Sequence, residues 1–290
     1  DPKELLFQPG RCMAHMAVDD AEVAFCTELK GKASWFLPFN QGWNSGAGNP
    51  PNPEGLKTDY LWKQVLTRES LANIIESYAQ VVEEEEADAR GKKRKKRKQI
   101  FPRFHQLRTV RALLRRAHTD GVGKRYLIQH SAGSGKSNTI AWLAHQLVEL
   151  RRKDGPMTAQ FDSIIVITDR RALDTQIART IKGYDHVASI FGHSDNAQEL
   201  REYLRRGKKI IVTTVQKFPF ILDELGDLSG KSFALLIDEA HSSQGGKTTA
   251  RMHEALGSKV AEEAFEEDST QDAVNAEIEQ RIASRKLLAN

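Results

Sequence analysis

From Pro102 onward, short apolar runs alternate with longer amphipathic segments. The short runs are apolar at nearly every position, which is typical of strands buried on both faces of a parallel sheet. The segments between them repeat apolar side chains every three or four residues, as one face of a helix does. Predicted strands are Tyr126–Gln129, Ile164–Thr168, Val187–Ile190, Ile210–Thr214 and Phe233–Asp238; predicted helices are Phe104–Ala117, Lys136–Arg151, Ala172–Lys182 and Asn196–Arg206. We therefore expect an α/β fold, with a parallel sheet that has helices on both faces and binds ligands at the carboxyl ends of its strands.

The first hundred residues follow a different pattern. Arg11–Asp19 and Glu22–Leu29 are rich in β-forming residues and predict a hairpin. Gly42–Gly55 is dense in Gly, Asn and Pro, which indicates an irregular loop, and Thr67 is a candidate N-cap for a helix. The apolar face of that helix would be Leu71, Ile74, Ile75 and Tyr78. Because a two-stranded hairpin is marginal alone, we expect the chain to begin inside an α+β domain whose earlier strands precede Asp1.

Basic charge is concentrated in one stretch. Residues 91–125 hold fourteen Lys and Arg against one Asp, a net +13, so the rest of a chain with a net charge of +4 carries −9. The densest part, GKKRKKRK at Gly91–Lys98, directly follows the acidic run Glu83–Glu86. Blocks of like charge are typical of solvated linkers. We expect a linker over 89–101 in which the two blocks neutralise each other, with phosphate contact as the alternative.

Composition excludes several classes of protein. With 290 residues, 39% of them hydrophobic, the chain can bury the cores of about two domains. No apolar run approaches the roughly 18 residues of a membrane span, and no leader opens the sequence, so a cytoplasmic protein with no membrane partner is expected. Cys12 and Cys26 have neither metal-site spacing nor the density of a disulfide framework, and are expected to be reduced strand residues.

The strongest chemical signal is SAGSGKS at Ser131–Ser137, between a predicted strand and a predicted helix. Glycines let backbone N–H groups turn inward around phosphates, and the helix N-terminus adds partial positive charge. In such a loop Lys136 reaches the β and γ phosphates, and the Ser137 hydroxyl binds Mg²⁺. The remaining loop residues in this prediction are Gly133, Ser134 and Gly135. The pattern departs from GxxxxGK at one place, where His130 stands at the first glycine position.

The second signal is DEAH at Asp238–His241, at the end of the last predicted strand. A carboxylate there faces a phosphate loop on the same edge of the sheet, so Asp238 can hold Mg²⁺ and Glu239 can polarise an attacking water molecule. The two motifs together predict ATP and Mg²⁺ as cofactors.

Together these motifs resemble motifs I and II of superfamily 2 helicases and translocases. The surrounding sequence narrows the resemblance to the restriction (R) subunits of bacterial type I restriction enzymes. The stretches similar to their motor region are IFPRFHQLRTVRALL, YLIQHSAGSGKSNTIAWLAHQL, IIVITDRRALDTQI, IIVTTVQKF and LLIDEAHSSQGG. Upstream, HMAVDDAEVAFCTELKGKASWFLPFNQG and GAGNPPNP are similar to the segment between the nuclease motifs and the motor. The resemblance covers nearly the whole chain.

The resemblance implies a RecA-like fold and an ATP-dependent translocase of double-stranded DNA within a type I restriction endonuclease. By the same resemblance Gln106 reads the adenine base, and His241 couples the ATP site to the DNA-facing half of the domain. The resemblance also implies that two motifs approach the DNA backbone; their residues are Asp169, Arg170, Gln176, Thr213, Thr214 and Gln216.

The resemblance also implies an organisation and partners. It makes 1–88 the end of the nuclease domain with connecting helices, 89–101 a basic linker, 102–257 the first RecA-like lobe and 258–290 a helical segment leading to the strand of motif III. Methyltransferase and specificity subunits are the expected protein partners. Without a second lobe to supply an arginine finger, this stretch alone should turn over little ATP.

Three other interpretations compete with this one. The main alternative is a passive basic module that tethers DNA, with a vestigial nucleotide site. A P-loop kinase is disfavoured by the DEAH motif and by the position of Gln106. Asp20 with Glu28-Leu29-Lys30 mimics the D…ExK pattern of nucleases, but the resemblance places the nuclease residues earlier, so we do not assign a metal site there.

Overall fold

The computed structural model describes residues 4–7, 10–44, 46–87, 93–131, 133–155, 157–168, 177–178, 180–181, 190–194, 196–214 and 230–238, with backbone alone for 83–87 and 93–96. Its helical elements are η1 (Leu5–Phe7), η2 (Gly31–Ala33), η3 (Leu61–Val65), α1 (Arg68–Ser77), α2 (Phe104–Asp120), α3 (Lys136–Glu149) and α5 (Ala197–Arg205). Its strands are β1 (His15–Val18), β2 (Val23–Cys26), β3 (Leu37–Pro38), β4 (Gln80–Ala87), β5 (Lys93–Ile100), β6 (Ser163–Thr168), β7 (Phe191–His193), β8 (Ile210–Thr214) and β9 (Phe233–Ile237).

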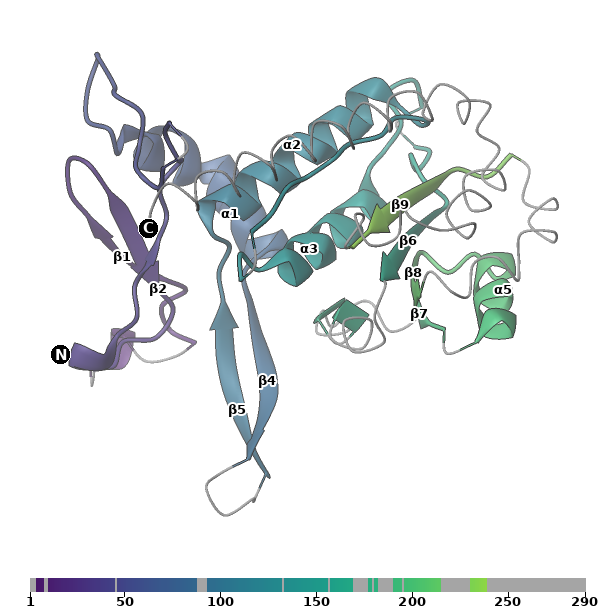
Figure 1. The fold of residues 1–290 in the computed structure, drawn as a ribbon, viewed down its shortest axis with the longest axis horizontal. Coiled ribbons are helices and arrows are strands. Elements are labelled where there is room, and N and C mark those ends of the chain that lie inside the picture. Colours follow the sequence, from purple (N-terminus) through teal and green to yellow (C-terminus); the bar gives the residue numbers. More distant parts are fainter. Residues whose placement is uncertain are drawn as a thin grey trace, which may run out of the picture.

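Four of these strands form the predicted parallel sheet, in the order β7-β8-β6-β9 (Figure 1). The central strand β6 is buried at every position. Its side chains alternate between two cores: Ile164 and Val166 lie in the core that includes α3, whereas Ile165 and Ile167 pack with Leu200 of α5. The prediction of an α/β fold with a parallel sheet and packed helices is therefore confirmed, and helices lie on both faces.

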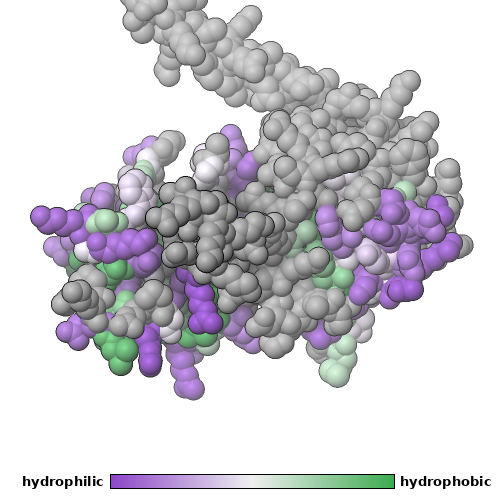
Figure 2. Space-filling model, turned by 90° about the horizontal axis from the view of Figure 1, so that it is seen from below, coloured by the Kyte–Doolittle hydropathy of each residue, from purple (hydrophilic) through white to green (hydrophobic). Residues whose placement is uncertain are grey.

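The two covering helices show the predicted amphipathic patterns. In α3 the buried positions include Leu143, Ala144 and Leu147, and the Trp142 side chain is also fully buried. Helix α5 begins behind Asn196, whose side chain accepts a hydrogen bond from the Glu199 amide at 2.9 Å. Figure 2 shows a mainly hydrophilic surface over α5, because its apolar side chains face the sheet.

Two predicted strands differ in the structure. Tyr126–Gln129 is not a strand; its residues are exposed, Leu127 by 81%, and the segment runs back along α2. Its two ends mark that path, since the Tyr126 hydroxyl donates to Asp120 at 2.8 Å and the His130 ring meets that of His105. A strand-forming sequence forms a strand only where a neighbouring strand can pair with its backbone hydrogen-bonding groups. No such partner lies beside this segment among the described residues.

The other difference lies at the strand predicted at Val187–Ile190. Residues 187–189 lie outside the described residues, and Ile190 directly precedes the strand β7, with its carbonyl accepting bonds from the Lys209 and Ile210 amides. The glycine in Phe191–His193 weakened the sequence signal. A Cβ on Gly192 would lie 2.6 Å from the Tyr203 ring, so the glycine marks a close approach between strand and helix.

Upstream, the predicted hairpin and helix are confirmed. Strands β1 and β2 pair antiparallel from Val18↔Val23, and the Asp19 carboxylate accepts hydrogen bonds from the amides of Ala21 and Glu22 in the turn. The two-residue strand β3 was not predicted and extends this sheet. Helix α1 begins behind Thr67, whose hydroxyl accepts from the Ser70 amide. Of its predicted apolar face, Ile74 and Tyr78 are buried, whereas Ile75 is 53% exposed. Both cysteines are free, Cys26 in β2 and Cys12 before β1 rather than in a strand.

The upstream elements share one hydrophobic core with the α/β part. The Trp142 indole of α3 donates to the Tyr78 carbonyl at 3.0 Å. The Arg111 guanidinium of α2 donates to Ser70 and Asn73 of α1 at 3.0–3.2 Å. The division of the chain into four parts stays a prediction, and these contacts place α1 firmly against the helices that follow.

Within the predicted linker 89–101, residues 93–100 form the strand β5, which pairs with β4 in a β-hairpin. Strands β4 and β5 pair antiparallel over eight residues each and project from the body of the molecule (Figure 1). Their register sets each residue of Glu83–Glu86 opposite a basic residue of Arg94–Arg97. Opposite charges across antiparallel strands stabilise the pair. The register thus places the two charge blocks opposite each other, which the count of like charges did not indicate, and their mutual neutralisation stays a prediction.

We expect stability to depend on pH through His145 of α3. Burial lowers the pKa of His145 from 6.5 to about 4, although the Ile181 carbonyl, 3.2 Å from Nε2, acts in the opposite direction. Between pH 6.5 and 4 the unfolded chain binds a proton on this histidine that the folded chain does not. The free energy of unfolding is therefore highest above pH 6.5 and falls toward pH 4, by up to about 3 kcal/mol. Denaturant unfolding of His145→Gln should show a shallower fall over this range, with exposed His118→Gln as control. Equal slopes for wild type and His145→Gln would contradict the assignment.

Candidate nucleotide site

The phosphate-loop sequence forms a turn that leads directly into α3. Helix α3 begins at Lys136 behind Gly135, whose left-handed φ of 85° no ordinary side chain adopts readily. The Gly135 carbonyl accepts the first helical bond, from the Thr139 amide. Gly133 is also left-handed, and Ser134 is buried between the two glycines. The five residues predicted to bind phosphate, Gly133, Ser134, Gly135, Lys136 and Ser137, therefore lie together at one helix N-terminus.

Two consecutive residues of α2 hold this loop. Gln106 is 3% exposed; its Oε1 accepts from the Arg103 amide and its Nε2 donates to the Gly135 carbonyl, each at 2.9 Å. The neighbouring His105 places Nε2 3.2 Å from the Ser134 carbonyl. Sequence reasoning found Gln106 by resemblance and missed His105, for which no local pattern gave a signal.

A side chain at Gly135 would displace the amide of Gln106 from its bond to the loop. A Cβ there would lie 2.5 Å from Gln106 Nε2, whereas one on Gly133, with a φ of 73°, would meet nothing within 4 Å. We expect Gly135→Ala to lower the free energy of unfolding by roughly 1–3 kcal/mol and to weaken nucleotide binding. Gly133→Ala is the matched control, since it adds left-handed strain without the clash. If the two variants have the same free energy of unfolding, the close contact between Gly135 and Gln106 does not affect stability.

Two histidines, His105 and His130, lie beside the loop without adding positive charge to it. Burial lowers the pKa of His105, as do Arg103 and Arg108, while the Ser134 carbonyl raises it. Burial also lowers the pKa of His130, with smaller effects from His105 and Lys136. The two rings meet edge to face at 5.6 Å. Both imidazoles are thus neutral near pH 7, which leaves Lys136 as the cation of the loop.

The carboxyl edge of the sheet carries Asp238, the first residue of the second motif. Asp238 follows β9 directly, is 6% exposed, and donates its amide to the Ile167 carbonyl of β6 at 2.9 Å. Thr213 and Thr214 end β8 on the same edge and are buried, and the Ser194 hydroxyl donates to that of Thr213 at 2.9 Å. In Figure 1, β6 and β9 point toward the side on which α3 begins. Loop and carboxylate therefore lie at the same end of the α/β layer.

Several predicted site residues lie outside the described residues. These are Asp169, Arg170, Gln176, Gln216, Glu239 and His241. Their roles remain predictions from the motifs and the resemblance.

The described loop fits a phosphate ligand. The Ser134 Oγ is buried and has no hydrogen-bond partner among the described residues, so its O–H is a candidate donor to a phosphate oxygen. No group of three or more metal-binding side chains occurs in the described ranges. That does not argue against Mg²⁺, which is commonly held by one or two side chains together with phosphate oxygens.

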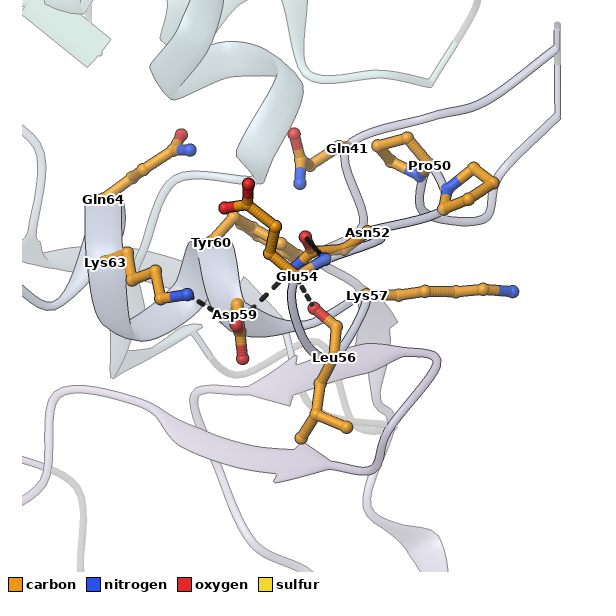
Figure 3. A pocket seen from close by; sticks show the side chains of 11 residues that line it. Gln41, Pro50, Asn52, Glu54, Leu56, Lys57, Asp59, Tyr60, Lys63 and Gln64 are labelled. Atoms are coloured by element: carbon orange, nitrogen blue, oxygen red, sulfur yellow. Dashed lines mark hydrogen bonds and ion pairs between the residues drawn. The ribbon is translucent and has the colours of Figure 1, made fainter.

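Two other groups of polar side chains offer less for binding or catalysis. An open pocket of about 360 Å³ lies in the upstream part, with Asp59 bonded to both Lys63 and Asn52 (Figure 3). The pKa of Asp59 is lowered chiefly by the Lys63 hydrogen bond, so this carboxylate is ionised and already paired. In the stretch that mimics the D…ExK pattern of nucleases, Lys30 forms an exposed ion pair with Glu28.

No helix in the described part of the chain is long and apolar enough to cross a membrane.

Comparison with known proteins defines the class. The SWI2/SNF2 ATPase family matches residues 105–262, more than half of the chain, so the chain belongs to this family. It is also distantly similar to R subunits of type I restriction enzymes, as the motifs predicted.

Two relatives carry that similarity. The chain is 30% identical over 136 residues to the C-terminal part of a putative type I restriction enzyme MpnIIP endonuclease subunit from Mycoplasma pneumoniae, covering 44% of this chain and 61% of that protein. It is 31% identical over 125 residues to the type I restriction enzyme HindI endonuclease subunit of Haemophilus influenzae, covering 41% of this chain and 11% of that protein. The chain thus spans less than two thirds of the length of either relative.

Proposed function

We propose that the chain is the ATP-binding part of the motor of a type I restriction endonuclease R subunit, which hydrolyses Mg-ATP to translocate double-stranded DNA. One observation carries the proposal: a glycine-rich loop opens α3 and is held from α2, at the end of the layer where Asp238 follows β9. Membership of an ATPase family and similarity to endonuclease subunits support it.

Each site residue has a role in this proposal. The Lys136 ammonium contacts phosphate oxygens, and backbone N–H groups of the loop bind others. The Ser137 hydroxyl and the Asp238 carboxylate hold Mg²⁺, which offsets phosphate charge. Glu239 orients and polarises the attacking water. Gln106 keeps one amide hydrogen and one lone pair beyond its two observed bonds, which suffices for a contact with adenine.

DNA-stimulated ATP hydrolysis by the full-length parent protein tests the proposal. A motor should hydrolyse ATP faster when double-stranded DNA is added together with the methyltransferase and specificity subunits. The passive tether has no reason to hydrolyse ATP, so DNA binding without hydrolysis would support that alternative instead.

The β4–β5 hairpin gives a second test of the tether. In the register, four glutamates of β4 stand opposite basic residues of β5. We therefore expect that replacing the seven basic residues of Gly91–Lys98 by Gln changes the slope of log K against log salt by far less than ~6, the change expected for seven lost phosphate contacts. Glu83–Glu86→Gln is the matched variant and should steepen the slope by freeing the basic strand. A slope reduced by about six in the first variant would identify the hairpin as the DNA-binding element.

A further inference from the structure

We propose that His105 is a positioning residue of the nucleotide site, holding the Ser134 carbonyl so that the phosphate loop presents its N–H groups to the ligand. This rests on the proposed nucleotide-binding function. We call His105 and Gln106 the α2 clip, since these consecutive residues bind the consecutive carbonyls of Ser134 and Gly135, at 3.2 and 2.9 Å.

The geometry of the peptide unit explains what the clip does. In a trans peptide the C=O of one residue and the N–H of the next point in opposite directions, and none of the described peptide bonds is cis. The Ser134 carbonyl shares its plane with the Gly135 N–H, and the Gly135 carbonyl shares its plane with the Lys136 N–H. Holding both carbonyls toward α2 therefore turns these two N–H groups to the opposite side, where a phosphate can accept from them.

His105 contributes something that α3 cannot. The Gly135 carbonyl already accepts the first bond of α3 from the Thr139 amide, so Gln106 adds to an orientation that the helix imposes. Ser134 precedes that first bond, and its carbonyl is directed by His105. Since a carbonyl only accepts, the imidazole must carry its hydrogen on Nε2. Burial and the edge-to-face contact with His130 hold the ring in place.

The test is a set of variants in the full-length protein, with Mg-ATP and adenosine binding measured by calorimetry. His105→Leu removes the donor, His105→Asn keeps an amide too short to reach, and His105→Gln places an amide N–H near the position of Nε2. We expect about tenfold weaker Mg-ATP binding for Leu and Asn, recovery to within about threefold for Gln, and unchanged adenosine binding for all three. His118→Leu, exposed on the same helix, is the control.

Wild-type Mg-ATP affinity in the Leu and Asn variants, or equal loss in the Gln variant, would overturn the proposal. Loss of adenosine affinity to the same extent would also overturn it, because the clip acts on phosphate donors alone. If His105→Leu does not fold, the contrast between Gln and Asn decides. Lys136→Ala separates the role of His105 from the proposed function. If this variant binds Mg-ATP normally, the assignment of the nucleotide site is wrong. If it loses Mg-ATP binding while the His105 variants keep it, only the role of the α2 clip is wrong.

Discussion

Lys136→Ala in the full-length protein should lose at least about a hundredfold in Mg-ATP affinity and show no measurable ATP hydrolysis. The ammonium at the start of α3 is the cation of the loop, and charge-assisted bonds to two phosphates are together worth a few kcal/mol. Lys136 is half-exposed and is not part of the hydrophobic core, so the thermal unfolding midpoint should stay near the wild-type value.

Isothermal calorimetry with Mg-ATP and a melting curve measure the two quantities on the same sample. Lys153→Ala, an exposed lysine after the end of α3, is the matched control for loss of one positive charge. Full ATPase activity of Lys136→Ala with a native melting curve would remove the phosphate-loop assignment.

Glu239→Gln should trap ATP. The substitution preserves size and hydrogen-bonding capacity but removes the negative charge that is proposed to polarise the attacking water, so hydrolysis should fall by roughly 10² to 10⁴. The proposed Mg²⁺ arrangement through Ser137 and Asp238 is unchanged, so ATP affinity should stay within a few-fold. Single-turnover hydrolysis and equilibrium binding measure the two effects separately.

Asp238→Asn is the informative comparison for Glu239→Gln. It should weaken the Mg²⁺-dependent part of ATP binding as well as hydrolysis, because Asp238 is proposed to hold the metal. Identical behaviour of the two variants would mean that the roles of these adjacent acids are not divided as proposed.

Features encoded locally were predicted well. The apolar runs at β6, β8 and β9 pair edge to edge and send side chains into the cores on both faces of the sheet. Helix α5 begins directly after Asn196, whose side chain satisfies a helix N-terminal amide. The glycine-rich loop was found from its own residues, since its conformation depends on them. These predictions needed no knowledge of partners distant in the sequence.

Features that depend on pairing were missed. The charge blocks lie in β4 and β5, whose register sets opposite charges across from each other. Tyr126–Gln129 has strand-forming side chains without a strand beside it among the described residues. His105 meets Ser134 across 29 positions of sequence. Nothing local marks such a contact, because it is created when α2 packs beside the loop.

The central claim is that binding and hydrolysis of ATP reside in one site whose loop and acids have separate roles. Equilibrium Mg-ATP binding by full-length Lys136→Ala and Glu239→Gln, measured side by side with wild type, tests it most directly. We predict that Glu239→Gln binds within a few-fold of wild type whereas Lys136→Ala shows no measurable binding. Equal binding by the two variants, whether both retain ATP or both lose it, would contradict the account.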